Sequence, residues 1–233
     1  MPPFDKTEDF SETFYQSFAQ RYAEISQQGL HSTYLESEHP RLKSDQDLIE
    51  RLKELVSSPA RGLDVGCGSE ARDVAYLFSG GYDIKGIDSV SEVIETAATL
   101  HPELASRLKV VDMRRPLDLP DASLDFVICN SVIQHIDAPT VEEVVLPSLA
   151  RVLIPGGVLM LVFKPGRGVL KLYDHHFQTQ RSFMLYDEDH IQGHLSSLGL
   201  TLIPPDGDRP GGLMHFRDGK GVRHAVGFWH KLA

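Results

Sequence analysis

The sequence has little cysteine and no long hydrophobic run. Cys67 and Cys129 are the only cysteines among 233 residues, and both fall in segments typical of strands. This scarcity argues against a disulfide framework and against a cysteine-ligated metal site. No apolar run approaches the roughly 18 residues that a membrane-spanning helix needs. The acidic N-terminal segment lacks the apolar core of a secretory signal, so we expect a cytoplasmic protein with no membrane partner.

Positive charge is also scarce. The chain has 23 Lys and Arg against 33 Asp and Glu, a net charge of −10. Such a balance disfavours a nucleic-acid partner, because phosphate binding needs a concentrated basic surface. The charge is uneven, however. Residues 164–233 hold nine Lys and Arg against seven Asp and Glu, a net charge of +2, which leaves −12 for residues 1–163. Composition gives no indication of the oligomeric state.

Short apolar runs alternate with amphipathic helical segments through most of the chain. We expect strands at residues 62–65, 84–87, 108–111, 124–129, 158–163, 200–203 and 225–232. We expect helices at residues 10–25, 45–56, 72–78, 91–100, 141–153 and 187–198, with Pro147 kinking or restarting the fifth. This alternation predicts βαβ units and a parallel sheet. The last two strands are joined by a loop, which predicts an antiparallel pair at the sheet edge.

The first expected strand ends in Leu63-Asp64-Val65-Gly66-Cys67-Gly68. Glycines there let the backbone turn sharply and approach a ligand at the mouth of a helix. Alone the pattern is weak, because dehydrogenases and ligand-free loops share it. The next strand ends in Asp88, 24 residues after Asp64. A carboxylate there can accept hydrogen bonds from both ribose hydroxyls of an adenosine. Together the two strand ends predict a nucleotide-like cofactor.

Three further segments continue the series. Asp112 and Met113 follow the third strand and supply an acid for an adenine amino group and a flexible apolar side chain for the ring. Asn130 and Ser131 follow the fourth strand. The turn Ile154-Pro155-Gly156-Gly157 precedes the fifth.

In this order and spacing, these segments resemble the class I S-adenosylmethionine-dependent methyltransferases over about residues 60–163. The stretch from Gly66 to Leu77, with Gly81–Ile84, is most similar to the tellurite-resistance and thiopurine methyltransferases of small molecules. The segment Ala19–Tyr22 is similar to helices that cap the cofactor in small-molecule methyltransferases. The resemblance implies S-adenosylmethionine as cofactor, bound by Tyr22, Asp64, Gly66, Cys67, Gly68, Asp88, Ser89, Asp112, Met113, Asn130 and Ser131.

The resemblance also implies an α/β fold, Rossmann-like and doubly wound. Its mostly parallel, seven-stranded sheet ends in an antiparallel strand. Residues 1–233 then form a single domain, with residues 1–58 as an N-terminal helical cap and residues 59–233 as the core. The implied activity is methyl transfer to a small-molecule acceptor.

One departure from the family pattern stands beside the first glycines. The third glycine is expected near position 70, where the chain has Ser69-Glu70-Ala71. Two other functions stay open at this point. An NAD-dependent oxidoreductase shares the first βαβ unit and tolerates alanine at the third glycine. A protein that binds S-adenosylmethionine without catalysis has the same motifs.

The acceptor side is less determined. His135 follows the fourth strand and is our candidate catalytic base, with His175 and His176 as comparable alternatives. None of these matches a metal-ligand spacing, so we expect no metal. The C-terminal cations and histidines predict a clamp for an anionic acceptor. They are Lys164, Arg167, Lys171, Arg181, Arg209, Arg217, Lys220, Arg223, His175, His176, His215 and His224.

Overall fold

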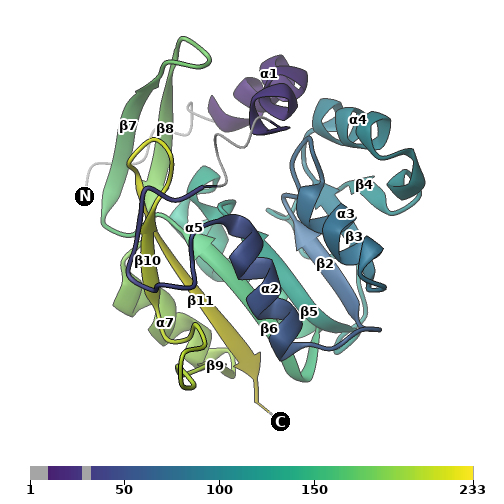
Figure 1. Ribbon diagram of the computed structural model, residues 1–233, viewed down its shortest axis with the longest axis vertical. Helices are drawn as coiled ribbons and strands as arrows, with labels where there is room; N and C mark the ends of the chain where they lie inside the picture. The colour runs from purple at the N-terminus through teal and green to yellow at the C-terminus, as the bar shows by residue number, and fades with distance from the viewer. Residues whose placement is uncertain (1–9, 28–32, 233) are drawn as a thin grey trace.

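The parallel half of the central sheet carries the predicted cofactor motifs. The structure is a computed structural model that describes residues 10–27 and 33–232. In these residues one sheet of nine strands runs in the order β1-β10-β11-β6-β5-β2-β3-β4, with β9 paired to β11 (Figure 1). Its parallel strands are β2 (Arg61–Val65), β3 (Asp83–Asp88), β4 (Leu108–Val110), β5 (Leu124–Asn130) and β6 (Leu153–Phe163).

The antiparallel half is larger than the sequence predicted. It consists of β1 (Glu36–Ser37), β9 (Leu200–Leu202), β10 (Met214–Arg217) and β11 (Arg223–Lys231). The sheet thus has two strands more than the seven expected, β1 and β10. Strand β11 lies between β6 and β10, so it is not at the edge as predicted. Only Met214 and Phe216 of β10 are buried, a pattern too short to stand out in a segment rich in Gly, Pro and Asp.

Helices cover both faces of the sheet, as a doubly wound fold requires. The helices α2 (Asp45–Leu55), α3 (Arg72–Ser79) and α4 (Ser91–Leu100) pack on one face. On the other face lie α6 (Leu146–Val152) and α7 (Glu188–Ser197). Alternate residues of β5 serve the two layers, since Phe126 and Ile128 face the first set of helices and Val127 and Cys129 the second.

The helix boundaries follow from local signals in the sequence. Ser44 caps α2, and its backbone N–H donates to Asp47 Oδ2 at 2.9 Å, as in a capping box. The 141–153 segment is divided as Pro147 predicts. The short α5 (Ala138–Thr140) and a π-helical turn, Val141–Val145, lead into α6, and Pro147 sits in the first turn of α6. Gly199, with φ of 78°, follows α7 in the left-handed conformation typical of that position.

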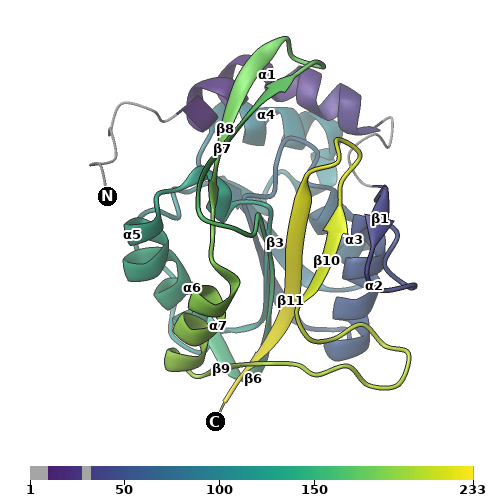
Figure 2. The same ribbon diagram turned by 90° about the vertical axis from the view of Figure 1, so that its left-hand side faces the viewer.

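A hairpin and a helix lie above the carboxyl ends of the parallel strands. The helix α1 (Phe10–Gln27) and the two-stranded sheet β7 (Gly168–Asp174) and β8 (Thr179–Leu185) form this upper layer (Figures 1 and 2). The hairpin was not predicted. The inward positions of β8 hold Arg181 and Phe183, and β7 is mostly exposed, so neither strand shows the usual alternation of apolar and polar residues.

The close approach of β2 to β5 depends on a glycine. A Cβ atom at Gly62 would lie 2.0 Å from the ring of Phe126, which is fully buried. We expect Gly62→Ala to reduce the free energy of unfolding by about 1–3 kcal/mol in urea denaturation, because the ring has no free space to move into. In a Phe126→Leu background the same substitution should cost less. An equal cost in both backgrounds would contradict the steric explanation.

Within residues 10–27 and 33–232, none of the helices combines the length and apolarity that a membrane crossing requires.

Candidate functional site

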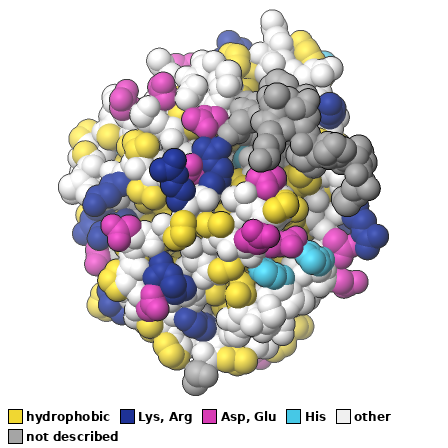
Figure 3. Space-filling view, turned by 180° about the vertical axis from the view of Figure 1, so that it is seen from behind, with side chains coloured by type: hydrophobic (Ala, Val, Ile, Leu, Met, Phe, Trp, Pro, Cys, Tyr) yellow, Lys and Arg dark blue, Asp and Glu magenta, His cyan; other side chains and the backbone are white. Residues whose placement is uncertain are grey.

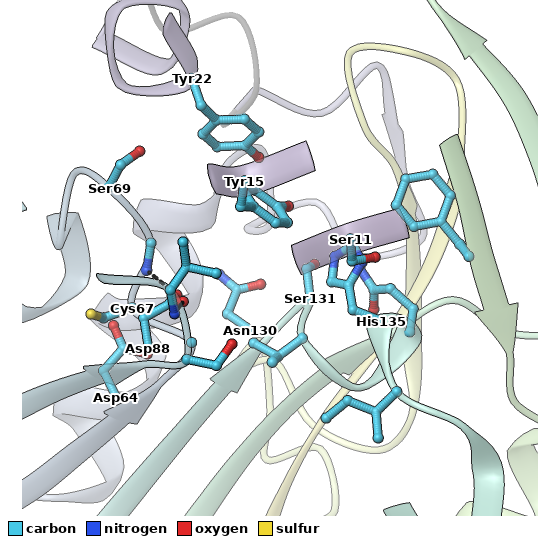
Figure 4. A pocket seen from close by; sticks show the side chains of 18 of the residues that line it. Ser11, Tyr15, Tyr22, Asp64, Cys67, Ser69, Asp88, Asn130, Ser131 and His135 are labelled. Atoms are coloured by element: carbon cyan, nitrogen blue, oxygen red, sulfur yellow. Dashed lines mark hydrogen bonds between the residues drawn. The ribbon is translucent and has the colours of Figure 1, made fainter. Parts of the chain in front are cut away.

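All the residues predicted to bind the cofactor line one cavity. It has a volume of about 280 Å³ and lies at the carboxyl ends of the parallel strands, beneath α1 and the hairpin (Figure 4). The structure brings together here, from separate segments, Tyr22, Asp64, Gly66, Cys67, Gly68, Asp88, Ser89, Asp112, Met113, Asn130, Ser131 and His135. Their individual roles remain predictions.

The loop after β2 adopts the backbone that its glycines permit. Gly66 and Gly68 have φ of 71° and 69°, in the left-handed region. A Cβ at Gly66 would lie 2.5 Å from Val132, whereas a Cβ at Gly68 would meet nothing within 4 Å. The Gly68 side of the loop therefore faces open space. Ala71, with φ of 41°, is the third left-handed residue. The position that favours glycine is thus 71, and Glu70 lies on the cavity wall beside it.

Asp88 is oriented by the backbone around it. Gly68 N–H donates to Oδ2 at 3.3 Å, and Val90 N–H donates to Oδ1 at 3.1 Å (Figure 4). Burial raises the pKa of Asp88, and these backbone donors oppose that rise. The carboxylate is therefore fixed at the cavity wall before any ligand binds.

The cofactor half of the cavity, formed by the ends of β2 to β5 and the loops that follow them, also contains the acids Asp64 and Asp112. Their surroundings differ. Asp64 is almost completely buried, and burial followed by the nearby charge of Asp73 raises its pKa well above the ordinary value. Asp112 is the reverse case. Burial alone would raise its pKa, but the backbone and side chain of Arg114 both donate to Oδ1 at 2.9 Å and lower it. Asp112 is therefore an ionised acceptor, while Asp64 holds its proton more tightly.

Two buried polar atoms on the cavity wall have no hydrogen-bond partner in the part of the chain that the structure describes. They are Ser69 Oγ and Gln134 Oε1. An unsatisfied buried polar atom costs free energy, so each is explained best by a ligand that bonds to it. Together with the open face of Gly68 and the fixed Asp88, these atoms fit a polar, adenosine-containing cofactor such as S-adenosylmethionine.

His135 lies at the opposite end of the cavity from the Gly66–Gly68 loop. Its Nδ1 is 2.8 Å from Ser11 Oγ of α1 (Figure 4). Burial, followed by the positive charges of Arg181 and Lys164, lowers the pKa of His135 well below its ordinary value. The imidazole is consequently neutral at pH 7, and it is a weak base.

Only part of the predicted cation clamp reaches the cavity. Lys164, Arg181, Lys220 and His224 line it, whereas His175 and His176 do not. Most of the other predicted cations form ion pairs outside the cavity. These pairs are Arg167–Asp187, Arg209–Asp206, Arg217–Glu36 and Arg223–Glu188. His215 contacts both Glu38 and Glu188. The prediction of one large cluster was therefore wrong, because most of these side chains lie on strand faces or turns that point away.

Comparison with known proteins identifies the cofactor half. Residues 63–161 match the family described as a methyltransferase domain. This segment spans β2 to β6 and contains every strand-end motif of the cofactor half. The chain carries a class I S-adenosylmethionine-dependent methyltransferase domain. The predicted family, fold class, cofactor and enzyme class are thereby confirmed, and the dehydrogenase alternative is set aside.

Solved structures show the same fold. A Burkholderia thailandensis 1,6-didemethyltoxoflavin-N1-methyltransferase is 17% identical, with a TM-score of 0.70 over 100% of this chain and 93% of that one. A Methanosarcina mazei S-adenosylmethionine-dependent methyltransferase is 22% identical, with a TM-score of 0.64 over 78% and 96%. A TehB-like methyltransferase from Corynebacterium glutamicum is 19% identical, with 0.62 over 94% and 98%.

The TehB-like structure is no more similar than the others, so the fold does not single out the tellurite-resistance subgroup. No curated protein matches the chain.

Several cavity residues of this methyltransferase domain and its surroundings were not predicted. Tyr15 comes from α1, and Asp174 from the hairpin. The neighbouring residues Phe14 and Phe18 pack instead on Phe177 of the hairpin, with ring centres 4.9 and 5.3 Å apart. Ser69 and Gln134 directly adjoin motif residues, which is the one signal that points to them. Nothing local distinguishes Asp174.

Proposed function

We propose that this methyltransferase transfers the methyl group of S-adenosylmethionine to a small, anionic acceptor. The observation that carries the proposal is a single cavity lined both by the cofactor motifs and by three cations: buried Lys164 directly after β6, buried Arg181 on β8, and partly exposed Lys220 in the turn before β11. The Burkholderia neighbour, whose structure holds 1,6-didemethyltoxoflavin and S-adenosylhomocysteine, supports an acceptor of small size.

Arg181 is the cation best placed to hold an anion. It is 8% exposed, and its nearest carboxylate, Asp174, lies 3.6 Å from Nη1. Asp174 is much closer to Lys220, at 2.6 Å. Asp174 therefore mainly compensates Lys220, and the charge of Arg181 is only weakly balanced. Its Nη2 donates to Tyr15 OH at 3.0 Å, which fixes the guanidinium at the cavity wall.

We assign the cofactor to Asp88, the Gly66–Gly68 loop, Asp112 and the two unsatisfied atoms, Ser69 Oγ and Gln134 Oε1. S-adenosylmethionine supplies an already activated methyl group. The protein then has to align the acceptor and exclude water, and alignment alone is worth on the order of 7–11 kcal/mol. The covering by α1 and the hairpin suits both tasks.

The face shown in Figure 3 gives no support to a nucleic-acid substrate. On the face shown in Figure 3, the coloured Lys and Arg side chains alternate with Asp and Glu, and they form no continuous basic area. This agrees with the net charge of −10.

The test is a screen of small molecules, sorted by charge, for formation of S-adenosylhomocysteine. Acidic acceptors should give turnover, and Arg181→Gln should raise KM for them about tenfold or more, because charged hydrogen bonds contribute roughly 1.5–3 kcal/mol. A preference for neutral or cationic acceptors would reject the anionic class alone. Tight cofactor binding with no turnover on any acceptor would favour a non-catalytic binding protein.

A further inference from the structure

Lys164 is a buried amine with no carboxylate partner among the described residues. It directly follows β6 and is 4% exposed. Its Nζ lies 3.0 Å from His224 Nε2 and 4.8 Å from the centre of the Phe183 ring. Among the described residues, no carboxylate oxygen lies within the 4.0 Å of Nζ that would define an ion pair. Lys220 differs, since it contacts Asp174 directly.

The hydrogen bonds around His224 favour the uncharged form of this amine. His224 Nε2 lies between Lys164 Nζ, at 3.0 Å, and Asp218 Oδ2, at 3.1 Å. Burial would raise the pKa of Asp218, but the hydrogen bond from His224 and other donors lower it to about 2, so Asp218 is ionised. The ionised carboxylate of Asp218 accepts a hydrogen bond from His224 Nε2–H, so the Nε2 proton points toward Asp218. A protonated Lys164 would then set N–H against N–H, whereas a neutral amine presents a lone pair.

The pKa of Lys164 depends on burial and on charged side chains from several neighbouring elements. Burial lowers its pKa to about 7. Asp218 opposes this change, while Arg181 of β8 and Lys220 of the β10–β11 turn add to it. Among the described residues, two histidines also interact with Lys164: His224 on β11 and His135 after β5. A base is most effective when its pKa lies near the working pH, and on this ground Lys164 suits the task better than His135.

The position of Lys164 is also suitable. Ser131 N–H donates to Val162 O at 3.0 Å, so the end of β5 and the end of β6 lie side by side. Lys164 is two residues beyond Val162. It therefore lines the same cavity as Asn130 and Ser131, the strand-end residues assigned to the cofactor.

We propose that Lys164 is the general base of methyl transfer and that the acceptor is a weak acid with an O–H or N–H group. The proposal rests on the proposed function. The acceptor's proton passes to the lone pair of Nζ. The electron pair left on the acceptor oxygen or nitrogen forms the bond to the methyl carbon, while the methyl–sulfur bond breaks with its pair remaining on sulfur. Lys164 afterwards releases the proton to water. The reacting oxygen or nitrogen thus becomes negatively charged in the site, in addition to the anionic group by which Arg181 holds the acceptor.

The first test needs no acceptor. In protein labelled with 13C at lysine Cε, the NMR signal that Lys164→Met removes should titrate with a midpoint near pH 7. Arg181→Gln should shift this midpoint upward, because the Arg181 charge disfavours the protonated amine. Binding of S-adenosylhomocysteine and the melting temperature show whether each variant is folded. A midpoint above pH 10 in the folded wild type would overturn the proposal, whether or not the protein turns over an acceptor.

The second test uses whichever acceptor the screen finds. Lys164→Met should lower kcat by about 100- to 10,000-fold at pH 7, with unchanged affinity for S-adenosylhomocysteine. The loss should shrink as the pH rises toward the pKa of the acceptor itself. His135→Gln is the matched control and should leave the pH profile in place. Full activity of Lys164→Met would contradict the role of Lys164. Loss of the pH dependence in His135→Gln would contradict it too, because His135 would then be the base.

Discussion

Replacing Asp88 by Ala should weaken the binding of S-adenosylmethionine and S-adenosylhomocysteine by about tenfold to 150-fold. The substitution removes the carboxylate that Gly68 and Val90 hold in place. Ribose hydroxyls would then lose a charged acceptor, a loss of roughly 1.5–3 kcal/mol. Isothermal titration calorimetry with S-adenosylhomocysteine measures the effect directly.

The matched control for this experiment is Asp83→Ala. Asp83 lies at the other end of β3 and pairs on the surface with Arg107, at 2.6 Å. Its removal takes away one carboxylate from the same strand without touching the cavity, so cofactor affinity should not change. Equal affinities of wild type and Asp88→Ala, both folded, would show that the ribose site lies elsewhere. The methyltransferase identity would stand in that case, because it does not depend on this residue.

Replacing Asp174 by Ala should destabilise the fold by about 3 kcal/mol or more. The Asp174 side chain is fully buried and contacts Lys220 Nζ, Arg181 Nη1 and the backbone N–H of His176. Without it, Lys220 loses its close carboxylate partner, and the buried Arg181 loses its only carboxylate within ion-pairing distance among the described residues. Breaking a buried pair from one side costs roughly 3–5 kcal/mol. The value should fall near the lower end, because Lys220 keeps some contact with water.

The same prediction has a dependence on pH. Burial would raise the pKa of Asp174, but Lys220 and Arg181 lower it, so the folded-state pKa lies below the unfolded value of about 3.9. Stability from such a group is present above the unfolded pKa and is lost as the pH falls through the folded one. The difference between wild type and Asp174→Ala in urea unfolding should be constant near neutrality and shrink below about pH 4.

Asp206→Ala is a control of the same chemistry, since Asp206 pairs with Arg209 on the surface and should cost no more than about 1 kcal/mol. Similar losses in the two variants would mean that burial does not amplify the Asp174 pairs.

The cofactor half of the molecule could be predicted because its signals are local. The glycines of the Gly66–Gly68 loop and the acid Asp88 each follow an apolar run directly, and parallel strands bring such strand ends to one edge of the sheet. The third left-handed position was placed at 70 from the family pattern, whereas the backbone puts it at Ala71. The family pattern gives the position of this residue only approximately, so it does not distinguish position 70 from position 71.

The proposed acceptor half of the cavity, lined by Lys164, Asp174, Arg181, Lys220 and His224, could not be predicted, because its residues become neighbours only through tertiary structure. Arg181 and Asp174 face each other across an unpredicted hairpin, and the inward Arg181 is itself what concealed β8. Lys164 was noted in the sequence only as one cation among many. Lys164 is buried, whereas Arg167, three residues later, is exposed, and the sequence does not show this difference.

The reversed direction of β11 has a consequence for how this enzyme can diversify. Because β11 runs against β6, the beginning of β11 meets the end of β6, and His224 comes to lie beside Lys164. The turn between β10 and β11, which carries Asp218 and Lys220, therefore lies at the cavity beside the end of β6, although it is far from β6 in the sequence. Apart from Tyr22, the residues predicted to bind the cofactor lie between 64 and 134, and the charged groups of the proposed acceptor half lie between 164 and 224. If the proposed acceptor half is correct, substitutions in the β7–β8 hairpin and in the β10–β11 turn should change which molecule is methylated and leave the binding of the methyl donor unaltered.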